Sequence, residues 1–315
     1  MILILTSKDD ATADFVAARL RSSEFFRLDT DDLPGAAKIE STERGSIIRT
    51  KGRKFTPEDF SGVWYRRPKA IIFAGGRDKA VARHAAAEYT AALEGFLSLV
   101  PVTKWINHPS RNVLAGHKLE QVRRAQRFGF RLPMTLVTQR VGELRRFWKK
   151  CHGNVILKPL STGYIERQPP FEDSLIYTNQ LRERDLARAA EIDRCPTLFQ
   201  ERIAKLGDIR ITVVDQDVQA VELTALDDGK PRLDIRRNNM FDVKYKRTEL
   251  PRTLKSKILR LVRSYGLRFA AIDMLWVGQS DYVFLEINPN GQWAWLDMAG
   301  ATNSRDSLIN ALKSG

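Results

Sequence analysis

The residues whose types and spacing point most directly to chemistry are two carboxylates and an amide near the C-terminus: Asp273, Glu286 and Asn288. They lie in, or directly after, two apolar runs at residues 269–277 and 282–287, which are rich in β-branched and aromatic side chains. The polar sequence Gly-Gln-Ser-Asp between the runs has a turn composition, so this stretch predicts a β-hairpin with a four-residue turn.

The register of that hairpin determines whether the two acids meet. If Val277 lies opposite Tyr282, antiparallel pairing also places Asp273 opposite Glu286. Directly opposed residues have Cβ atoms roughly 4.5–5.5 Å apart, and Asn288 shares the face of Glu286 because strand side chains alternate. Like charges side by side are unfavourable unless a cation lies between them, and oxygen ligands of this kind suit Mg²⁺ that also holds phosphates.

The alternative is a solvated pair of acids at the edge of a sheet. The sequence Asn-Pro-Asn-Gly that follows Ile287 favours the metal site, because such a loop is a poor core segment but offers good ligand geometry. The sequence therefore predicts a magnesium site on this hairpin.

Cationic residues upstream could contribute anion contacts to this hairpin. Lys118 lies early in a helix predicted from Ser110 onwards, and Lys158 ends an apolar strand predicted at 155–158, where a buried lysine needs a partner. On the predicted strand 208–214, Asp208 and Arg210 share a polar face opposite an apolar one. For any one of these residues alone, a solvated surface charge is the simpler interpretation.

Composition limits the class of protein. The 315 residues suffice for two or three packed units, and the net charge of +14 indicates a polyanionic partner: a nucleotide, a nucleic acid, an acidic peptide or an anionic membrane surface. Cys151 and Cys195 are the only cysteines, which indicates neither a disulfide framework nor a zinc site and fits a reducing cytoplasm. The apolar opening MILIL is too short for a signal segment or a membrane span.

The elements that must position these residues predict an α/β chain of three units. Residues 1–100 form an N-terminal α/β domain with a strand at 2–5, a polar hairpin arm at 47–55 and a long helix at 78–99. Residues 101–195 form a central lobe with a basic helix at 141–150, and the polar segment 160–172 looks like a loop able to fold over phosphates. Residues 196–315 form a C-terminal lobe with strands at 197–203, 208–214 and 217–223 and a helix from Pro251.

The order and separation of these residues resemble the ATP-grasp ligases. The resemblance rests on Lys118, Lys158, the strand Phe199-Gln200-Glu201-Arg202-Ile203, Asp208, Arg210, Asp273, Glu286 and Asn288. The segments LDTDDLP, VWYRRP, WINHPS, LPMTLVT, DIRITVV and FLEINPNGQW extend it over nearly the whole chain and are similar to the microviridin-type (graspetide) peptide macrocyclases, relatives of ribosomal-protein glutamate ligases. The implied fold is ATP-grasp, an α/β protein with α+β lobes behind a pre-ATP-grasp α/β domain.

The resemblance also implies roles for individual residues in binding ATP, two Mg²⁺ ions and a peptide. The residues expected to bind ATP are Lys118 and Lys158 at the phosphates, Gln200, Glu201 and Ile203 towards the adenine, and Asp208 at the ribose. Asp273, Glu286 and Asn288 would hold the metal ions. Arg210 and Arg236 would be catalytic, and Arg66, Lys244 and Tyr245 would bind the substrate.

Two departures from the subgroup's pattern concern the phosphate loop and the peptide side. The loop at 161–163 is poor in glycine, and Asp234-Ile235-Arg236 has an isoleucine where the subgroup usually has an aromatic residue. Residues 233–247, which contain Lys244 and Tyr245, have no helical or strand periodicity and are either a substrate-facing loop or a solvated one.

We therefore expect an ATP- and Mg²⁺-dependent carboxylate ligase that forms ester or amide crosslinks in a ribosomally made acidic precursor peptide through an acyl phosphate. Such an enzyme would act in the cytoplasm as a homodimer, without nucleic acid or membrane. The alternatives are a ligase that adds amino acids to a protein tail or small molecule, and a basic nucleic-acid- or peptide-binding module without catalysis. The basic residues are spread along the chain rather than gathered on one recognition helix, which argues against nucleic acid.

Overall fold

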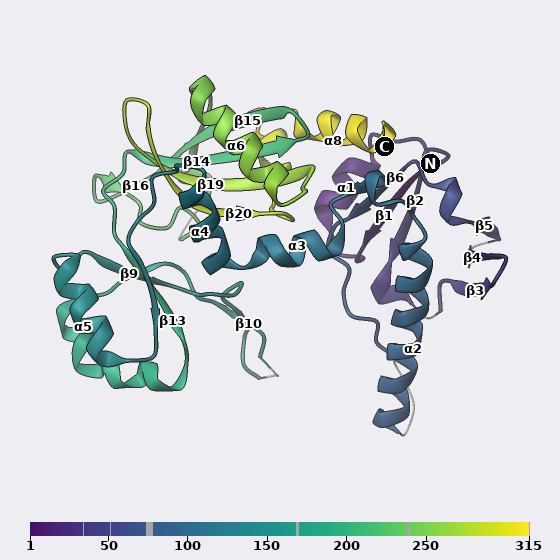
Figure 1. Ribbon diagram of the computed structural model, residues 1–315, viewed down its shortest axis with the longest axis horizontal. Helices are drawn as coiled ribbons and strands as arrows, with labels where there is room; N and C mark the ends of the chain where they lie inside the picture. Colours follow the sequence, from purple (N-terminus) through teal and green to yellow (C-terminus); the bar gives the residue numbers. More distant parts are fainter. Residues whose placement is uncertain (34, 51, 74–77, 168–169, 238–239, 315) are drawn as a thin grey trace.

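The computed structural model describes residues 1–33, 35–50, 52–73, 78–167, 170–237 and 240–314. An N-terminal domain lies at one end of the molecule, and two lobes built on antiparallel sheets lie at the other (Figure 1). The N- and C-termini lie close together, and Lys313 donates a hydrogen bond to the carboxylate of Glu24. None of the helices in the described part of the chain combines the length and apolarity that a bilayer crossing requires.

The N-terminal domain is built on a parallel sheet whose two faces are both buried. Its strand order is β2-β1-β6-β7, with β1 at Ile2–Thr6, β2 at Phe25–Asp29, β6 at Gly62–Tyr65 and β7 at Trp105–Ile106. Ile2 and Ile4 pack with residues of α1 (Ala11–Ala17) and α8 (Ser304–Lys313), whereas Leu3 and Leu5 pack with residues of α2 (Lys79–Ser98). Burial on both faces explains the unbroken apolar opening of the chain. Because β7 joins this sheet, the domain extends past the boundary predicted at residue 100.

The predicted hairpin arm is part of a small three-stranded sheet, β3-β4-β5. Its strands lie at Lys38–Thr42, Gly45–Thr50 and Arg53–Phe55, and three 3₁₀ turns, η1 (Thr30–Asp32), η2 (Pro57–Asp59) and η3 (Val102–Lys104), complete the domain.

The helix expected from Ser110 is two helices. The first, α3, spans Pro109–Gly116, and α4 spans Lys118–Arg127. The break falls at His117, whose extended backbone (φ −81°, ψ 101°) starts a new helix axis. His108 rather than Ser110 is the N-cap of α3, and Lys118 becomes the first residue of α4.

The central lobe has the sheet order β12-β9-β13-β8. The strands are β8 (Thr135–Thr138), β9 (Val155–Lys158), β12 (Asn179–Gln180) and β13 (Thr197–Glu201), and α5 (Val141–Lys150) and η4 (Glu183–Arg194) cover one face. The strand expected to open the last unit is β13, which pairs with β8 and β9 and so belongs to this lobe. The expected phosphate loop at 160–172 contains β10 (Tyr164–Ile165), which pairs with β11 (Ser174–Leu175) just beyond it; residues 168–169 lie outside the described residues.

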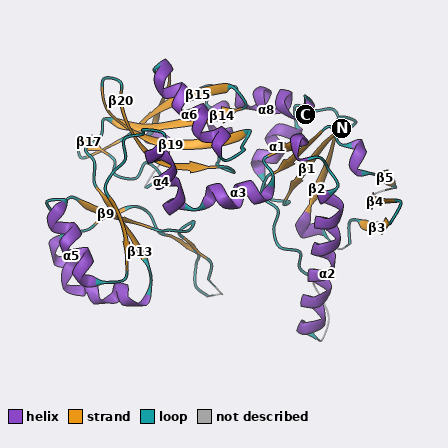
Figure 2. Ribbon diagram, in the orientation of Figure 1, coloured by secondary structure: helices purple, strands orange, loops and turns teal. Residues whose placement is uncertain are grey.

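The C-terminal lobe is a five-stranded antiparallel sheet in the order β18-β15-β14-β19-β20. Its strands are β14 (Gly207–Val214), β15 (Asp217–Thr224), β18 (Lys244–Thr248), β19 (Phe269–Gly278) and β20 (Asp281–Asn288). One face packs on α6 (Arg252–Ser264), which Figure 2 shows lying across the strands. The same core takes Ala115 and Ala125 from α3 and α4, so this lobe also uses residues from the segment assigned to the central lobe.

The alternation predicted for the middle strand of this sheet is confirmed. Ile209, Ile211 and Val213 are buried in the helix-covered core, which leaves Asp208 and Arg210 on the opposite face. Residues 233–247 contain η5 (Met240–Asp242) and the start of β18, although no strand was expected there; residues 238–239 lie outside the described residues. The remaining elements are β16 (Leu226–Asp227), β17 (Lys230–Pro231) and α7 (Ala294–Met298).

Candidate functional site

The hairpin β19–β20 places Asp273 opposite Glu286, as predicted. The turn differs from the prediction: Gly278 pairs with Asp281, so the turn has two residues, and Trp276 rather than Val277 lies opposite Tyr282. Ser280, the second residue of this turn, has a left-handed backbone conformation (φ 58°).

Arg210, Asp273 and Glu286 form one row across the three neighbouring strands β14, β19 and β20. The Nη1 atom of Arg210 donates to both carboxylate oxygens of Asp273 at 2.8 Å. The Nζ atom of Lys118 lies 3.4 Å from Oε2 of Glu286. Each carboxylate therefore has its own cation, and the two like charges are tolerated side by side.

Lys118 and Lys158 both line a small pocket between the lobes. Gln200, Glu286, Leu119, Val122, Thr135, Leu198 and Leu285 complete its lining. Lys118 Nζ donates to the carbonyl of Pro159 (2.8 Å), and Lys158 Nζ donates to Oε1 of Gln200 (3.0 Å). Burial lowers the pKa of Lys158, against the opposing charge of Glu286. Burial would raise the pKa of Glu286, but the charges of Lys118, Lys158 and Arg210 outweigh it and lower that pKa.

The residues predicted to bind the rest of the nucleotide are Gln200, Glu201, Ile203 and Asp208. Gln200 Nε2 donates to the hydroxyl of Thr135 (3.1 Å), and Oε2 of Glu201 accepts from the backbone N–H of Met134 (3.1 Å). Ile203 lies just beyond the end of β13 and is half-buried. Asp208 accepts a hydrogen bond from Lys205 Nζ (2.5 Å), and burial raises its pKa.

Arg66 has a different position from the one predicted. Its side chain is 1% exposed, and it donates to the carbonyl of Asn290 (2.5 Å) and to Oε1 of Gln292 (2.6 Å). A guanidinium enclosed in this way has no free surface for drawing in a peptide, so the structure does not support a direct substrate contact for Arg66.

The other residues expected on the peptide side divide between the two faces of the sheet. Tyr245 pairs with Leu223 on the face that carries Arg210, and its ring lies 5.3 Å from that of Trp295. Lys244 points to the opposite face and is exposed, so the structure does not bring it to the site. Arg236 makes a two-point contact with the carboxylate of Asp234 (2.9 and 2.8 Å).

Sequence reasoning did not find Gln121, a buried residue of α4. Its side-chain amide donates to the carbonyl of Ile287 (2.8 Å) and accepts from the N–H of the same residue (3.1 Å). The side chain of Gln121 therefore makes the two hydrogen bonds that a neighbouring strand would make to Ile287, between Glu286 and Asn288 on β20. A glutamine one helical turn after Lys118 was the only available signal, and periodicity alone would place it at an ordinary core boundary.

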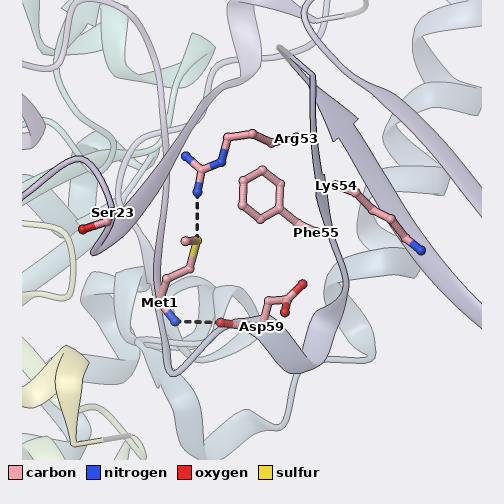
Figure 3. Close-up of a pocket in the computed structure, with 6 residues that line it drawn as sticks. All are labelled: Met1, Ser23, Arg53, Lys54, Phe55 and Asp59. Carbon is pink, nitrogen blue, oxygen red and sulfur yellow. Dashed lines mark hydrogen bonds between the residues drawn. The ribbon is translucent and has the colours of Figure 1, made fainter.

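A second, wider pocket lies in the N-terminal domain, and no residue of the Asp273–Glu286 row lines it. Its walls are Met1, Ser23, Arg53, Lys54, Phe55 and Asp59 (Figure 3). The guanidinium of Arg53 lies 4.7 Å from the centre of the Phe55 ring, and the amino group of Met1 donates to the carbonyl of Asp59. We assign no chemistry to this pocket.

Comparison with known proteins gives consistent results. Residues 1–112 match the family described as MvdD pre-ATP grasp domain. A search of curated protein sequences gave no match. The macrocyclase MdnC from Microcystis aeruginosa MRC, solved with its precursor peptide MdnA, superposes with a TM-score of 0.83 at 24% identity, over 99% of this chain and 98% of that one.

Two further structures are similar over the full length of the chain. A RiPP-associated ATP-grasp ligase from Chryseobacterium gregarium, solved with ADP and a leader and core peptide, is 27% identical, with a TM-score of 0.80 over 99% of this chain and 95% of that one. The macrocyclase MdnB from Microcystis aeruginosa MRC is 26% identical, with a TM-score of 0.79 over 100% and 99%. The chain is therefore an ATP-grasp ligase that begins with an MvdD pre-ATP grasp domain, as the resemblance in its sequence predicted.

Proposed function

We propose that this protein is an ATP- and Mg²⁺-dependent ligase that forms side-chain ester or amide crosslinks in a ribosomally made precursor peptide. The observation that carries the proposal is the row Arg210–Asp273–Glu286, with Lys118 against Glu286. Its neighbours in fold include enzymes whose structures hold a precursor peptide or ADP, which supports the same class of substrate here.

The residues of the row fit a magnesium ion that shares its ligands with phosphate. Among the described residues, no three His, Cys, Asp or Glu side chains gather into a metal site, so Asp273, Glu286 and Asn288 supply only part of a coordination shell. Two carboxylates and one amide suit Mg²⁺, because this ion is usually held by one or two carboxylates and takes its other ligands from water and substrate phosphates. The buried Nε of Arg210 has no hydrogen-bond partner among the described residues, which leaves a donor for a phosphate oxygen.

The chain's own residues would position and neutralise the reacting groups. Mg²⁺ held by Asp273, Glu286 and Asn288 would withdraw negative charge from the phosphates of ATP. Lys118 and Lys158 would hold the phosphates, and Arg210 would donate to the phosphoryl group in transfer. A peptide carboxylate attacks the γ-phosphorus and ADP leaves, which gives an acyl phosphate.

A hydroxyl or amine of the same peptide then completes the crosslink. It attacks the acyl carbon, loses its proton, and phosphate leaves, so the peptide loses one water for each bond formed. The nearby guanidinium and ammonium groups would stabilise the oxyanion of the tetrahedral intermediate.

The net charge of +14 supports an acidic peptide as the substrate, because a positive surface raises the local concentration of a polyanion. We further propose that the enzyme works as a homodimer in the cytoplasm, where ATP and Mg²⁺ are supplied. The homodimer and the cytoplasmic location rest on the resemblance. Light scattering would test the first, and fractionation of the source cells would test the second.

The test uses purified full-length protein, ATP, Mg²⁺ and a candidate precursor peptide encoded next to the ligase gene. The expected product is lighter by one water per bond, with ADP and phosphate formed in step. If ADP appears only with free amino acids, the enzyme is instead an amino-acid ligase. If no carboxylate stimulates hydrolysis while RNA or duplex DNA binds tightly at physiological salt, the protein is a nucleic-acid-binding module and the proposal is wrong.

A further inference from the structure

The loop that follows β20, residues 289–292, is held in place by contacts from the N-terminal domain. Arg66, one residue after the end of β6, donates through Nη1 to the carbonyl of Asn290 (2.5 Å) and through Nη2 to Oε1 of Gln292 (2.6 Å). Arg67 adds a longer hydrogen bond to the same Asn290 carbonyl (3.3 Å). Two oxygens of one loop therefore accept from a single guanidinium, which has the fork geometry for such a contact.

Arg66 is itself held in one position. Its Nε lies 3.5 Å from Oδ2 of Asp10, and Asp10 is fixed because it caps α1 and accepts from the hydroxyl of Thr6. The hydroxyl of Thr12 donates to the same Gln292 oxygen that Arg66 reaches (2.8 Å). Burial, with the charge of Arg67, lowers the pKa of Arg66 to about 10, so the side chain stays charged at neutral pH. A buried charge of this kind is costly unless its partners are in place, which favours one arrangement of the loop.

A second strand end of the N-terminal sheet contacts the same loop. Asn107, directly after β7 and 2% exposed, donates to the carbonyls of Pro289 (3.0 Å) and Phe269 (2.8 Å). Its Oδ1 accepts from the N–H groups of Arg268 and Phe269. Asn107 therefore joins the start of β19 to the loop after β20, at the end of the hairpin opposite the turn.

The loop that Arg66 and Asn107 contact also contacts Asn288, a predicted metal ligand. The N–H of Asn290 donates to Oδ1 of Asn288 (3.1 Å), so the position of Asn290 sets the orientation of the Asn288 side chain. We propose that Arg66 is a positioning residue through which the N-terminal domain orients Asn288 for Mg²⁺. This role deepens the proposed function and rests on it where the metal is concerned, whereas the loop contacts exist without it.

The first test measures the loop itself, without metal or nucleotide. Hydrogen–deuterium exchange of peptides covering residues 286–295 is compared between wild type, Arg66→Met, Arg66→Lys and the control Arg27→Met. Arg27 is a mostly buried arginine of the same domain that pairs with Asp14 and Asp29 and does not contact the loop. We expect exchange at the amides of residues 290–292 to rise by about 10–100-fold in Arg66→Met, because hydrogen bonds to a charged group are lost. In Arg66→Lys the rise should be smaller, and in Arg27→Met it should be absent.

The second test measures binding and turnover. In Arg66→Met, the Mg²⁺ concentration for half-maximal ADP formation should rise at least about 10-fold, while the Kd of ATP measured in EDTA stays unchanged. Gln292→Ala removes one acceptor without changing Arg66, and serves as the second variant if Arg66→Met does not fold; it should give a smaller change in the same direction. A merely structural role would lower activity at all Mg²⁺ concentrations alike.

Unchanged exchange at residues 290–292 in folded Arg66→Met, or an equal rise in Arg27→Met, would show that Arg66 does not hold the loop. Raised exchange with an unchanged Mg²⁺ requirement would overturn the role towards the metal. If wild-type protein forms no ADP with any carboxylate, the proposed function fails, and the exchange experiment still decides whether Arg66 holds the loop.

Discussion

Asp273 lies directly opposite Glu286 because two one-residue bulges in the β19–β20 hairpin cancel. Val277 is the extra residue on β19, between the pairs Gly278–Asp281 and Trp276–Tyr282, and Leu285 is the extra residue on β20. With only the first bulge, the register would place Glu286 opposite Ile272, a residue of the apolar core. The second bulge, next to the site, returns Glu286 to the polar face, as bulges near active sites commonly do.

Substitutions at the predicted metal ligands should abolish metal-dependent chemistry while leaving the fold intact. Glu286→Gln keeps the shape of the side chain but removes its charge, and Asn288→Ala removes an amide ligand. We expect ADP formation to fall by at least about 100-fold in each variant, because metal stabilisation of the transition state is worth several kcal/mol. Circular dichroism should show an unchanged fold, and near-normal ADP release with precursor and Mg²⁺ would contradict the metal assignment.

Lys158 should matter to ATP binding where Lys149 does not. Lys158 donates to Gln200 inside the pocket, whereas Lys149 lies exposed in the last turn of α5. Lys158→Ala should weaken binding of a non-hydrolysable ATP analogue by about 10–100-fold, because a charge-assisted contact to phosphate is lost. Lys149→Ala is the matched control and should bind within twofold of wild type by calorimetry. Equal losses would make Lys158 a solvated strand end.

Gly291 is required by close approach rather than by backbone conformation. A Cβ at this position would lie 2.4 Å from Cβ of Ala271 and 2.9 Å from Nη2 of Arg210. Gly291→Ala should lower the free energy of unfolding by about 1–3 kcal/mol, the usual cost of overpacking, and should reduce turnover as the loop shifts. Gly278→Ala is the control, since a Cβ there meets nothing within 4 Å.

A double variant separates packing from other causes in that experiment. Ala271→Gly removes the atom that the new methyl group would meet, so Ala271→Gly with Gly291→Ala should recover part of the lost stability. No recovery would mean that the contact with Arg210 dominates. Thermal and urea unfolding measure the difference.

Gln121 should be more important than its place on a helix suggests. Gln121→Leu keeps the volume but leaves the N–H and carbonyl of Ile287 without their partners in a buried edge, at about 1–3 kcal/mol for each group. Gln126→Leu on the exposed face of the same helix is the control and should change stability little. Urea unfolding checks this, and similar losses in both variants would show that Gln121 contributes only packing.

Arg236 should affect crosslinking rather than ATP binding. It is half-exposed and held by Asp234, which also accepts from the backbone N–H of Thr178. Arg236→Ala should slow crosslink formation, followed by mass spectrometry, while the Kd of ATP stays constant. Lys246→Ala is the control, because Lys246 lies on the opposite face of the sheet and pairs with Glu222. Equal damage to ATP binding and crosslinking would place Arg236 in the nucleotide site.

Local patterns were sufficient for the elements whose side chains alternate or recur with a clear period. The helix expected at 141–150 is α5, residue for residue, and the polar and apolar faces of β14 follow from alternation alone. The pairing of Asp273 with Glu286 was also correct, although the bulges that produce it were not predicted. The ATP-grasp fold and its N-terminal domain were implied by the resemblance of the sequence to that family, which ordered site residues and several longer segments carry.

Only the tertiary structure decided what depends on contacts between distant segments. Arg66 and Gln292 are 226 positions apart, and no periodicity shows that a strand-end arginine becomes fully buried under a loop of another domain. Long-range contacts also place β13 in the central sheet, because its pairing partners are β8 and β9. In the same way, the pairing of β18 with β15 puts Lys244 on the face of the sheet opposite Arg210. Local sequence determines which residues can form an element, but long-range packing determines which groups lose water and face one another.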